Sequence, residues 1–261
     1  MQIKANGIAI NALVDGSEGA PWLVFSNSLA TTLAMWDDQA RELSRAFRVL
    51  RYDQRGHGAT EAPAGRYTFE QLIADAVALM DVLGIKKAHF AGLSMGGATA
   101  LGLAQKHPDR LDKVIVCDSP CQSTPVSAQQ WEERIVIAQK QGMEPLVEPT
   151  VGRWFPPEIM EANPPYIDRV RQMVRSTPVN GFIGCAAALA NHNYAAAVAT
   201  VTRPVLFMAG EKDGVTPTAM RKLSAALPGS RYVELPGAGH ISNMDQPQGF
   251  TWAVADFLKA S

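Results

Sequence analysis

The chain has 261 residues, of which 47% are hydrophobic and 19% charged, and its formal net charge is -1. This length is sufficient for one large α/β domain or two small ones with a sizeable core. The near-neutral charge and a pI near 6.5 argue against a nucleic-acid partner or a membrane-surface partner, because either would require a basic patch.

The cysteines and the first residues bear on the compartment in which the protein works. Cys117, Cys121 and Cys185 are too few and too odd in number for a disulfide framework, which favours a reducing compartment. Residues 1–6 lack the apolar stretch of a signal peptide, and no run approaches membrane-spanning length. We therefore expect a cytoplasmic protein without a membrane partner.

The first part of the chain alternates predicted strands and helices. Residues 2–14 alternate polar and apolar side chains around Asn6-Gly7, which predicts a hairpin with a tight turn. The elements that follow are a strand at 22–25, a polar loop at 26–31, a helix at 33–43, a strand at 47–52, a loop rich in glycine and charge at 53–58, and a helix at 69–83.

A G-x-S-x-G pattern then follows a short apolar strand at 88–91 and precedes a helix at 98–106. In Gly92-Leu93-Ser94-Met95-Gly96, this context predicts a serine nucleophile on a sharp strand-to-helix turn. A residue forced into an unfavourable backbone conformation needs neighbours without a β-carbon, so that the helix and the strand can approach closely. The alternative interpretation is an ordinary turn.

Beyond this turn, strands at 114–117, 204–209 and 232–235 complete a mostly parallel sheet covered by helices on both faces. The alternation of strands and helices stops between the strand at 114–117 and the strand at 204–209, where several prolines interrupt the helical patterns. We expect residues 122–197 to form an inserted helical cap over the carboxyl edge of the sheet, where ligands bind in open α/β folds. Residues 1–121 and 198–261 would form the core.

A serine hydroxyl is a poor nucleophile at neutral pH and needs a base within hydrogen-bonding reach. His240 is our candidate, because it follows the last predicted strand in a glycine-rich loop that can place an imidazole over the sheet edge. His57, between two glycines, is the main competitor. The remaining histidines are better explained by packing in a strand (His89), by a position where a helix ends (His107) or by a place in the insertion (His192).

The base needs a carboxylate to orient it. In one class of serine hydrolases this acid lies between the serine and the histidine in chain order, directly after a strand. Asp213 satisfies this requirement after the strand at 204–209, and Asp118 satisfies it after the strand at 114–117. We favour Asp213 because glycines flank its loop, and Asp118 remains the alternative.

An oxyanion hole would complete the chemistry. One donor should be the backbone N–H of Met95, the residue after the nucleophile, and the other should come from the loop at 27–30, for which we select the N–H of Leu29. Neither donor depends on the identity of its side chain.

With these residues in place, the chain resembles the α/β-hydrolase superfamily over its whole length. That resemblance rests on Ser94, Asp213, His240 and the loop at 52–58. Within the superfamily the chain is most similar to the 3-oxoadipate enol-lactonase family. The closer match rests on Ser26-Asn27-Ser28-Leu29 with Met35-Trp36 and Gln39, Gly142-Met143 with Arg153-Trp154-Phe155, and Gly239-His240-Ile241-Ser242. The chain departs from the family in having Ala30 where glycine is expected and Glu211-Lys212 before the acid.

The resemblance implies the α/β-hydrolase fold and a serine hydrolase that needs no metal and no organic cofactor. Its substrate would be a small anionic lactone, 3-oxoadipate enol-lactone, opened through an acyl-enzyme in the breakdown of aromatic compounds. The alternatives are a general short-chain carboxylesterase or perhydrolase of the same fold, and a hydrolase-fold ligand receptor with slow turnover. The oligomeric state stays open.

The carboxylate of such a lactone requires a cationic or donor group in the pocket, because a buried unpaired anion is strongly disfavoured. The insertion offers Arg134, Lys140, Arg153, Arg169, Arg171 and Arg175, which are matched there by seven acidic residues. Most of these cations should be solvated surface charges. We select Arg134 and Trp154 as substrate-binding residues, with plain packing beneath the insertion as the alternative for Trp154.

Overall fold

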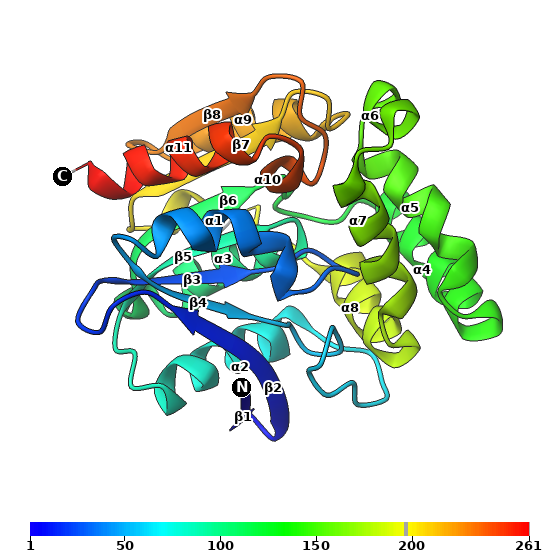
Figure 1. Ribbon diagram of the computed structural model, residues 1–261, viewed down its shortest axis with the longest axis horizontal. Coiled ribbons are helices and arrows are strands. Elements are labelled where there is room, and N and C mark those ends of the chain that lie inside the picture. Colours follow the sequence, from blue (N-terminus) through cyan, green and yellow to red (C-terminus); the bar gives the residue numbers. More distant parts are fainter. Residues whose placement is uncertain (196–197, 261) are drawn as a thin grey trace.

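The computed structural model describes residues 1–195 and 198–260. Within these residues the strands form one eight-stranded sheet in the order β1-β2-β4-β3-β5-β6-β7-β8, with helices on both sides (Figure 1). The strands are β1 (Gln2–Ala5), β2 (Ile8–Asp15), β3 (Trp22–Ser26), β4 (Arg48–Tyr52), β5 (Ala88–Leu93), β6 (Leu111–Cys117), β7 (Val205–Gly210) and β8 (Arg231–Leu235). The predicted mostly parallel sheet is therefore confirmed.

The antiparallel part of the sheet is confined to one edge. β1 and β2 form the predicted hairpin, with Ala5 opposite Ile8 and with Asn6 and Gly7 at positive φ angles of 46° and 79°. Two such residues make the tight turn whose twist matches that of the flanking strands. β2 is also antiparallel to β4, while every later neighbouring pair from β4–β3 to β7–β8 is parallel.

The central strands are apolar because both of their faces are covered. All six residues of β7 are buried, as are the last four residues of β6. A strand buried on both faces has no use for alternating polar side chains, so its sequence reads as a continuous apolar run. Because β3, β5, β6, β7 and β8 run parallel to one another, their carboxyl ends meet at one edge of the sheet.

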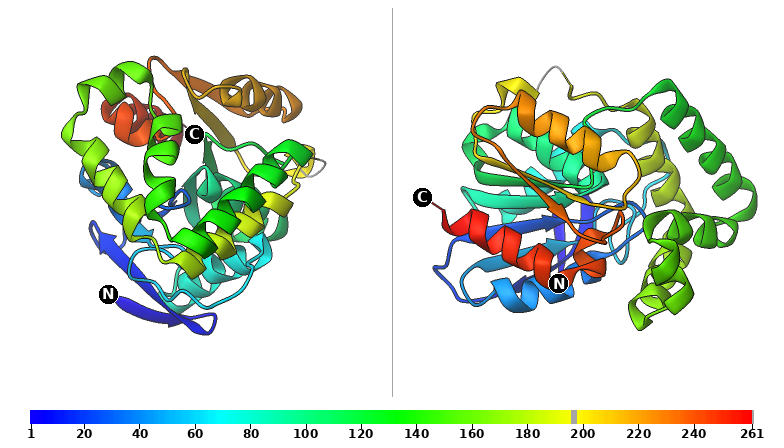
Figure 2. Two further views of the ribbon diagram at one scale, coloured as in Figure 1. Left: turned by 90° about the vertical axis from the view of Figure 1, so that its right-hand side faces the viewer. Right: turned by 90° about the horizontal axis from the view of Figure 1, so that it is seen from above.

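The helices divide between the two faces (Figure 2). α1 (Asp37–Leu43) packs beside α11 (Pro247–Lys259) on one face, and α2 (Phe69–Val82) packs beside α3 (Met95–Lys106) on the other, with α9 (Thr216–Ala226) on the same side as α3. α2 begins at a capping box, in which Thr68 Oγ1 accepts the amide of Gln71 and the Gln71 side chain accepts the amide of Thr68.

The predicted helix at 33–43 differs from the structure at its start. Residues Leu33–Trp36 form a 3₁₀ turn, η1, and the α-helix begins only at Asp37. The carboxylate of Asp53 accepts the amide of Leu33 at 2.7 Å, and Thr32 Oγ1 accepts the amide of Ala34 at 3.3 Å. These two bonds satisfy the first amides and hold the chain in the tighter turn.

Among the described residues, five α-helices lie between β6 and β7: α4 (Pro125–Gln141), α5 (Val147–Trp154), α6 (Pro157–Ala162), α7 (Pro165–Ser176) and α8 (Val179–Asn191), with the short 3₁₀ helices η3 (Glu144–Leu146) and η4 (Val198–Thr200). The α-helices stand together beside one end of the sheet (Figure 1). Pro125, Pro157 and Pro165 each occupy the first residue of a helix, where the missing N–H would have no partner. The prolines thus begin these helices rather than interrupt them.

The predicted division into a core of residues 1–121 and 198–261 and a cap of residues 122–197 stays a prediction. Its boundary residues 197 and 261 lie outside the described part of the chain.

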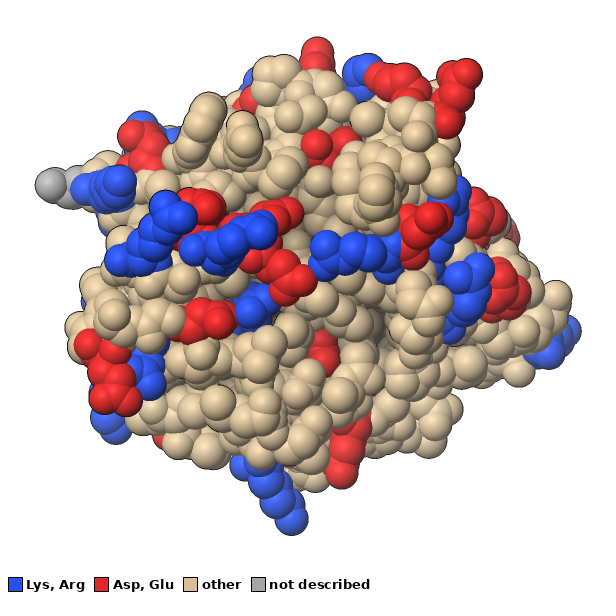
Figure 3. Space-filling view, in the orientation of Figure 1, with Lys and Arg blue, Asp and Glu red and all other residues tan. Residues whose placement is uncertain are grey.

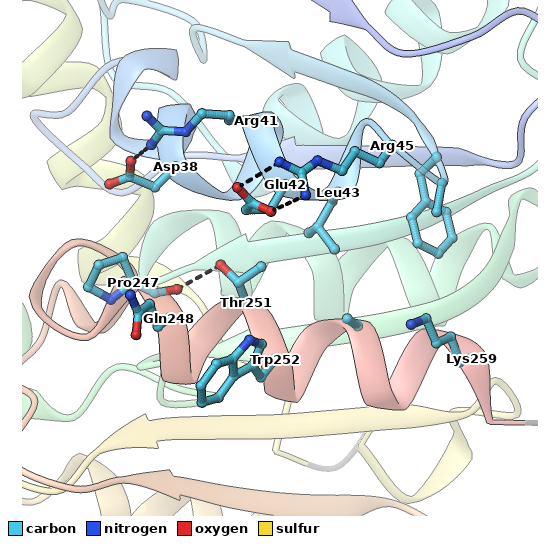
Figure 4. A pocket seen from close by; sticks show the side chains of 13 residues that line it. Asp38, Arg41, Glu42, Leu43, Arg45, Pro247, Gln248, Thr251, Trp252 and Lys259 are labelled. Atoms are coloured by element: carbon cyan, nitrogen blue, oxygen red, sulfur yellow. Dashed lines mark hydrogen bonds and ion pairs between the residues drawn. The ribbon is translucent and has the colours of Figure 1, made fainter.

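The remaining surface has few distinctive features. On the face seen in Figure 3, many acidic side chains lie beside basic ones, notably over α1 and α11. A groove of about 650 Å³ runs between these two helices; the ion pairs Arg41–Asp38 and Arg45–Glu42 lie along its α1 side (Figure 4). None of the described helices combines the length and apolar character that crossing a bilayer requires.

Candidate active site

Ser94 occupies the turn between β5 and α3, with φ 55° and ψ −113°. A serine rarely adopts this conformation, and such strain persists only where the surroundings enforce it. A β-carbon on Gly92 would lie 1.9 Å from the carbonyl oxygen of Gly96, and one on Gly96 would lie 2.0 Å from that of Ser26. The steric reason predicted for the two glycines is confirmed, since neither distance is compatible with a side chain.

The structure brings Ser94, His240 and Asp213 into one hydrogen-bonded row. Ser94 Oγ donates to His240 Nε2 at 3.0 Å, and His240 Nδ1 donates to Asp213 Oδ2 at 2.8 Å. The three residues follow β5, β8 and β7, whose carboxyl ends lie at the same edge of the sheet. An imidazole held in this way can take the serine proton, and the carboxylate can stabilise the resulting imidazolium.

Asp118, the alternative acid, lies elsewhere. Its carboxylate is fully buried: Oδ1 accepts the amide of Gly210 at 2.7 Å, and Oδ2 accepts the hydroxyl of Ser242 at 2.5 Å. Burial raises the pKa of Asp118 well above its ordinary value, and the charge of Asp213 raises it further. Asp118 therefore joins the segment before Asp213 to the segment after His240, without a hydrogen bond to the imidazole itself.

Two backbone amides near Ser94 are free to bind an anion. Among the described residues, neither the amide of Leu29 nor that of Met95 has a hydrogen-bond partner. Met95 is the first residue of α3, so its N–H also carries the positive end of the helix dipole. Donors of this kind can stabilise the oxyanion that forms when a serine attacks an ester carbonyl.

The loop that carries Leu29 is held from beneath. The amide of Ala30 donates to His57 Nε2 at 2.9 Å, and Gln54 Nε2 donates to the carbonyl oxygen of Asn27 at 2.6 Å. Ala30 has φ 57°, the left-handed region that favours glycine, which explains why glycine was expected at this position. The network fixes the direction of the neighbouring Leu29 amide.

His57, the competing base, thus lies under this loop and not beside the serine. It is fully buried, and burial lowers its pKa, which keeps the ring neutral so that Nε2 can accept the amide of Ala30. Its Nδ1 lies 3.1 Å from the carbonyl oxygen of Arg55. Both ring nitrogens are engaged with backbone, so His57 is suited to holding the loop.

The other histidines are also placed away from the serine hydroxyl. His89 packs edge-on against Phe47, with 5.7 Å between ring centroids, and His107 follows the last residue of α3. His192 borders the cavity described next, but its Nδ1 lies 2.8 Å from the carbonyl oxygen of Leu189 and its Nε2 lies 3.3 Å from that of Pro120.

A cavity of about 340 Å³ opens between the serine and the helices α4 to α8, which we call the cap helices. Its lining combines the three residues of the hydrogen-bonded row with residues of the 27–30 loop, of α4, and of the end of α5. The lining residues that matter for the chemistry are Ser94, Asp213, His240, Leu29, Trp131, Arg134, Arg153 and Trp154. The structure therefore brings both predicted substrate-binding residues, Arg134 and Trp154, to the same cavity as Ser94.

The five arginines of the cap fall into two groups. Three arginines are paired with carboxylates: Arg169 with Asp37 at 2.9 Å, Arg171 with Glu148 at 2.8 Å and Arg175 with Glu144 at 2.7 Å. Arg134 and Arg153 have no carboxylate within 4.0 Å among the described residues, and both border the cavity. The sequence placed Arg153 among six candidates but did not single it out, because its contact with α4 depends on how two separate helices pack.

Trp154 is buried, with 4% of its surface exposed, and its indole stacks on the imidazole of His240 at 6.1 Å between ring centroids. Its carbonyl oxygen also accepts the amide of His240 at 2.7 Å. One cap residue thus touches the histidine through both its ring and its backbone. Trp154 can therefore position the imidazole as well as border the space for a ligand.

Comparison with known proteins gives one family and several close relatives. The profile of the family described as alpha/beta hydrolase fold matches residues 21–247. A 3-oxoadipate enol-lactonase from Acinetobacter baylyi is 35% identical over 257 residues, which are 98% of this chain and 96% of that protein.

Solved structures agree with this result. The crystal structure of the enol-lactonase from Burkholderia xenovorans LB400 superimposes with a TM-score of 0.96 at 40% identity and covers 100% of both chains. A thermophilic esterase from Thermogutta terrifontis, solved with malate bound, gives a TM-score of 0.92 at 28% identity and covers 99% of this chain and 96% of that one.

Proposed function

Because this chain belongs to the α/β-hydrolase family, we propose that it is a serine hydrolase that opens 3-oxoadipate enol-lactone to 3-oxoadipate, a step in the breakdown of aromatic compounds. One observation carries the proposal: a single cavity holds the Ser94–His240–Asp213 row and two arginines that have no carboxylate partner within the described part of the chain. The relatives named as enol-lactonases, at 35% and 40% identity over nearly the whole chain, support the choice of substrate.

In the first step Ser94 Oγ attacks the ring carbonyl carbon while His240 Nε2 takes the serine proton. Asp213 holds the imidazole in the tautomer that leaves Nε2 free to accept and stabilises the positive charge that the ring acquires. The carbonyl oxygen becomes an oxyanion that the amides of Leu29 and Met95 bind. Because these amides have no partner among the described residues, binding the oxyanion requires no rearrangement of existing hydrogen bonds.

Collapse of the tetrahedral intermediate breaks the bond between the acyl carbon and the ring oxygen. The leaving group is an enolate oxygen on the same molecule, and the imidazolium of His240 can return its proton to it. The enol then tautomerises to the ketone. Water, activated by the neutral His240, attacks the acyl-enzyme in the second half of the reaction and releases the second carboxylate together with free Ser94.

The acetate arm of the lactone carries a carboxylate that needs a positive partner. Arg134 borders the cavity without a competing carboxylate among the described residues, so it can bind this arm without breaking an existing ion pair. Trp154 closes the space beside His240. Together they would hold the ring carbonyl over Ser94.

The test is to follow the ultraviolet absorbance of the enol-lactone after addition of the purified protein. We expect absorbance to be lost with the native chain and to stay constant with Ser94→Ala, since removal of a serine nucleophile costs on the order of 10⁶-fold in kcat. Ser44→Ala is the matched control, because Ser44 lies at the end of α1 and its hydroxyl contacts only the carbonyl oxygen of Arg41. An Ser94→Ala protein with native activity would contradict the proposal.

A comparison of p-nitrophenyl acetate with the lactone separates this function from that of a general esterase. A pocket bordered by Arg134 and Arg153, which have no ion pair with any described carboxylate, should give a higher kcat/KM for the anionic lactone than for the neutral ester. A higher kcat/KM for the neutral ester would favour the esterase, and a single turnover that stops at the acyl-enzyme would favour a receptor.

A further inference from the structure

Trp131 on α4 lies between two arginines from different helices. The Cζ atom of Arg134 lies 4.8 Å from the centroid of the Trp131 ring, and the Cζ atom of Arg153 on α5 lies 5.9 Å from it. The indole attracts both guanidinium groups through its π face, which holds two like charges against one ring. All three residues border the cavity that contains Ser94.

Two like charges at one place repel each other, and the rest of the cap avoids this by pairing its arginines with carboxylates. At the end of α7, for example, Arg175 donates to Glu144 from both Nε and Nη2, at 2.7 and 3.0 Å. Arg134 and Arg153 have no such partner among the described residues. The only carboxylate that borders their cavity in this part of the chain is that of Asp213, which is bonded to His240 and acts on Arg153 through its charge without forming an ion pair within 4.0 Å. Their charges are therefore available to a ligand.

A second group of cavity residues also favours negative charge. The free amides of Leu29 and Met95 and the start of α3 lie beside Ser94, where hydrolysis would leave the new carboxylate of the product. A linear molecule with a carboxylate at each end could then place one carboxylate against the two arginines and the other against the amides beside Ser94.

We propose that the Arg134–Trp131–Arg153 cluster and the amides beside Ser94 together form a binding site for linear dicarboxylates, so that the product of the reaction and its analogues inhibit the enzyme. This inference rests on the proposed function for the position of the second carboxylate. It adds Arg153 to the ligand-binding residues and assigns the site a second class of ligand.

The test measures inhibition of p-nitrophenyl acetate hydrolysis by unbranched dicarboxylates from malonate to pimelate, each paired with the monocarboxylate of the same carbon number. We expect competitive inhibition with an optimum at one chain length. At that length the dicarboxylate should bind about 10- to 100-fold more tightly than its monocarboxylate, as expected for one additional charge-assisted interaction. Added salt should reduce this preference.

Arg134→Gln and Arg153→Gln should each lower the preference for the dicarboxylate, and the double variant should abolish it. Arg175→Gln is the matched control, since Arg175 lies on the cap, is paired with Glu144 and does not border the cavity. Inhibition constants are compared within each variant, so a changed rate of ester hydrolysis does not affect the result. Thermal unfolding of each variant confirms that it is folded.

Equal inhibition by dicarboxylates and monocarboxylates would overturn the inference, as would an unchanged preference in Arg153→Gln. Isothermal titration calorimetry with the same acids provides a second measurement that needs no turnover. The outcome is independent of the lactone assay. Selective dicarboxylate binding without lactone hydrolysis would support the dicarboxylate site and contradict the proposed substrate. Lactone hydrolysis without selective dicarboxylate binding would support the proposed substrate and contradict the site.

Discussion

Polar groups at the carboxyl edge of the sheet are mostly bonded to their neighbours. By contrast, Arg134 and Arg153, which we call the wall of the cavity, have no carboxylate partner in the residues that the structure describes. At the edge, His57, Asp118 and Asn27 are all fully buried and hold neighbouring backbone through hydrogen bonds. On the wall, Arg134 is half-buried and Arg153 is exposed, although burial lowers the pKa of Arg153 and the charge of Asp213 opposes this effect. The edge fixes the positions of Ser94, His240 and Asp213, and the wall presents positive charge to the cavity.

Solvent explains why the two regions differ. A buried polar group without a partner costs about 1–3 kcal/mol, so most groups of the edge are bonded, and among the described residues the amides of Leu29 and Met95 and the hydroxyl of Ser28 are exceptions. A guanidinium in contact with water is already solvated and loses little when it has no partner. The wall can therefore keep its cations free for a ligand, at small cost to stability. Changes at the edge should thus affect turnover or folding, and changes at the wall should affect selectivity.

The largest expected effect is a difference in kcat between variants of Asp213 and Asp118, the two carboxylates at the edge of the sheet. Asp213→Asn should lower kcat on the order of 10⁴-fold, because an amide favours the wrong imidazole tautomer. Asp118→Asn should lower kcat by less than about tenfold, because asparagine can still accept the amide of Gly210 and donate to Ser242. Steady-state kinetics on the lactone and on p-nitrophenyl acetate would check this, and equal losses in the two variants would contradict the assignment of Asp213.

The next effect belongs to the wall. Arg134→Gln should raise KM for the anionic lactone about 10- to 100-fold and change kcat little, since it removes a charge-assisted interaction distant from the bond that breaks. Arg175→Gln serves as the control. If the Arg134 variant hydrolyses neutral and anionic lactones in the same ratio as the native chain, Arg134 does not bind the carboxylate.

A smaller effect concerns the pH dependence of stability. Burial lowers the pKa of His57 in the folded chain. Protonation therefore favours the unfolded chain, in which the pKa of a histidine is about 6.5. The stability that the neutral His57 contributes is present above this pH and is lost as the pH falls below it.

Urea unfolding between pH 7 and 5 would test this dependence. The native chain should lose stability with a steeper slope than His57→Gln, and the variant should be about 1–3 kcal/mol less stable at pH 7 if the amide of Ala30 loses its partner. Parallel slopes for the two proteins would show that His57 is not buried in its neutral form.

The smallest effect compares two serines of the edge. Ser26 Oγ lies 3.0 Å from the hydroxyl of Tyr52, whereas Ser28 Oγ is buried without a partner among the described residues. Ser26→Ala should cost about 1 kcal/mol, and Ser28→Ala should change the free energy of unfolding by less than about 0.5 kcal/mol. Urea unfolding would measure both, and a larger loss for Ser28→Ala would reveal a bond formed by its hydroxyl in solution.

The local sequence was sufficient for the turn at Ser94 and for most strands. Gly92 and Gly96 flank a serine between a strand and a helix, and their steric role follows from the pattern alone. The start of the helix at 33–43 was wrong, because the amide of Leu33 is bonded to Asp53, a residue twenty positions away. Local periodicity carries no information about such a contact.

The sequence by itself determined that this chain forms a mostly parallel α/β sheet with a serine at a strand-to-helix turn, because apolar periodicity and glycine placement are local properties. Only the tertiary structure placed Asp213 and not Asp118 beside His240, placed His57 beneath the loop at 27–30, and left Arg153 beside Arg134 without a carboxylate partner among the described residues. Each of these outcomes depends on which strand ends and helices pack side by side. The groups that form hydrogen bonds come from segments far apart in the chain. Burial determines which of these groups need a partner, because water can solvate only the exposed ones.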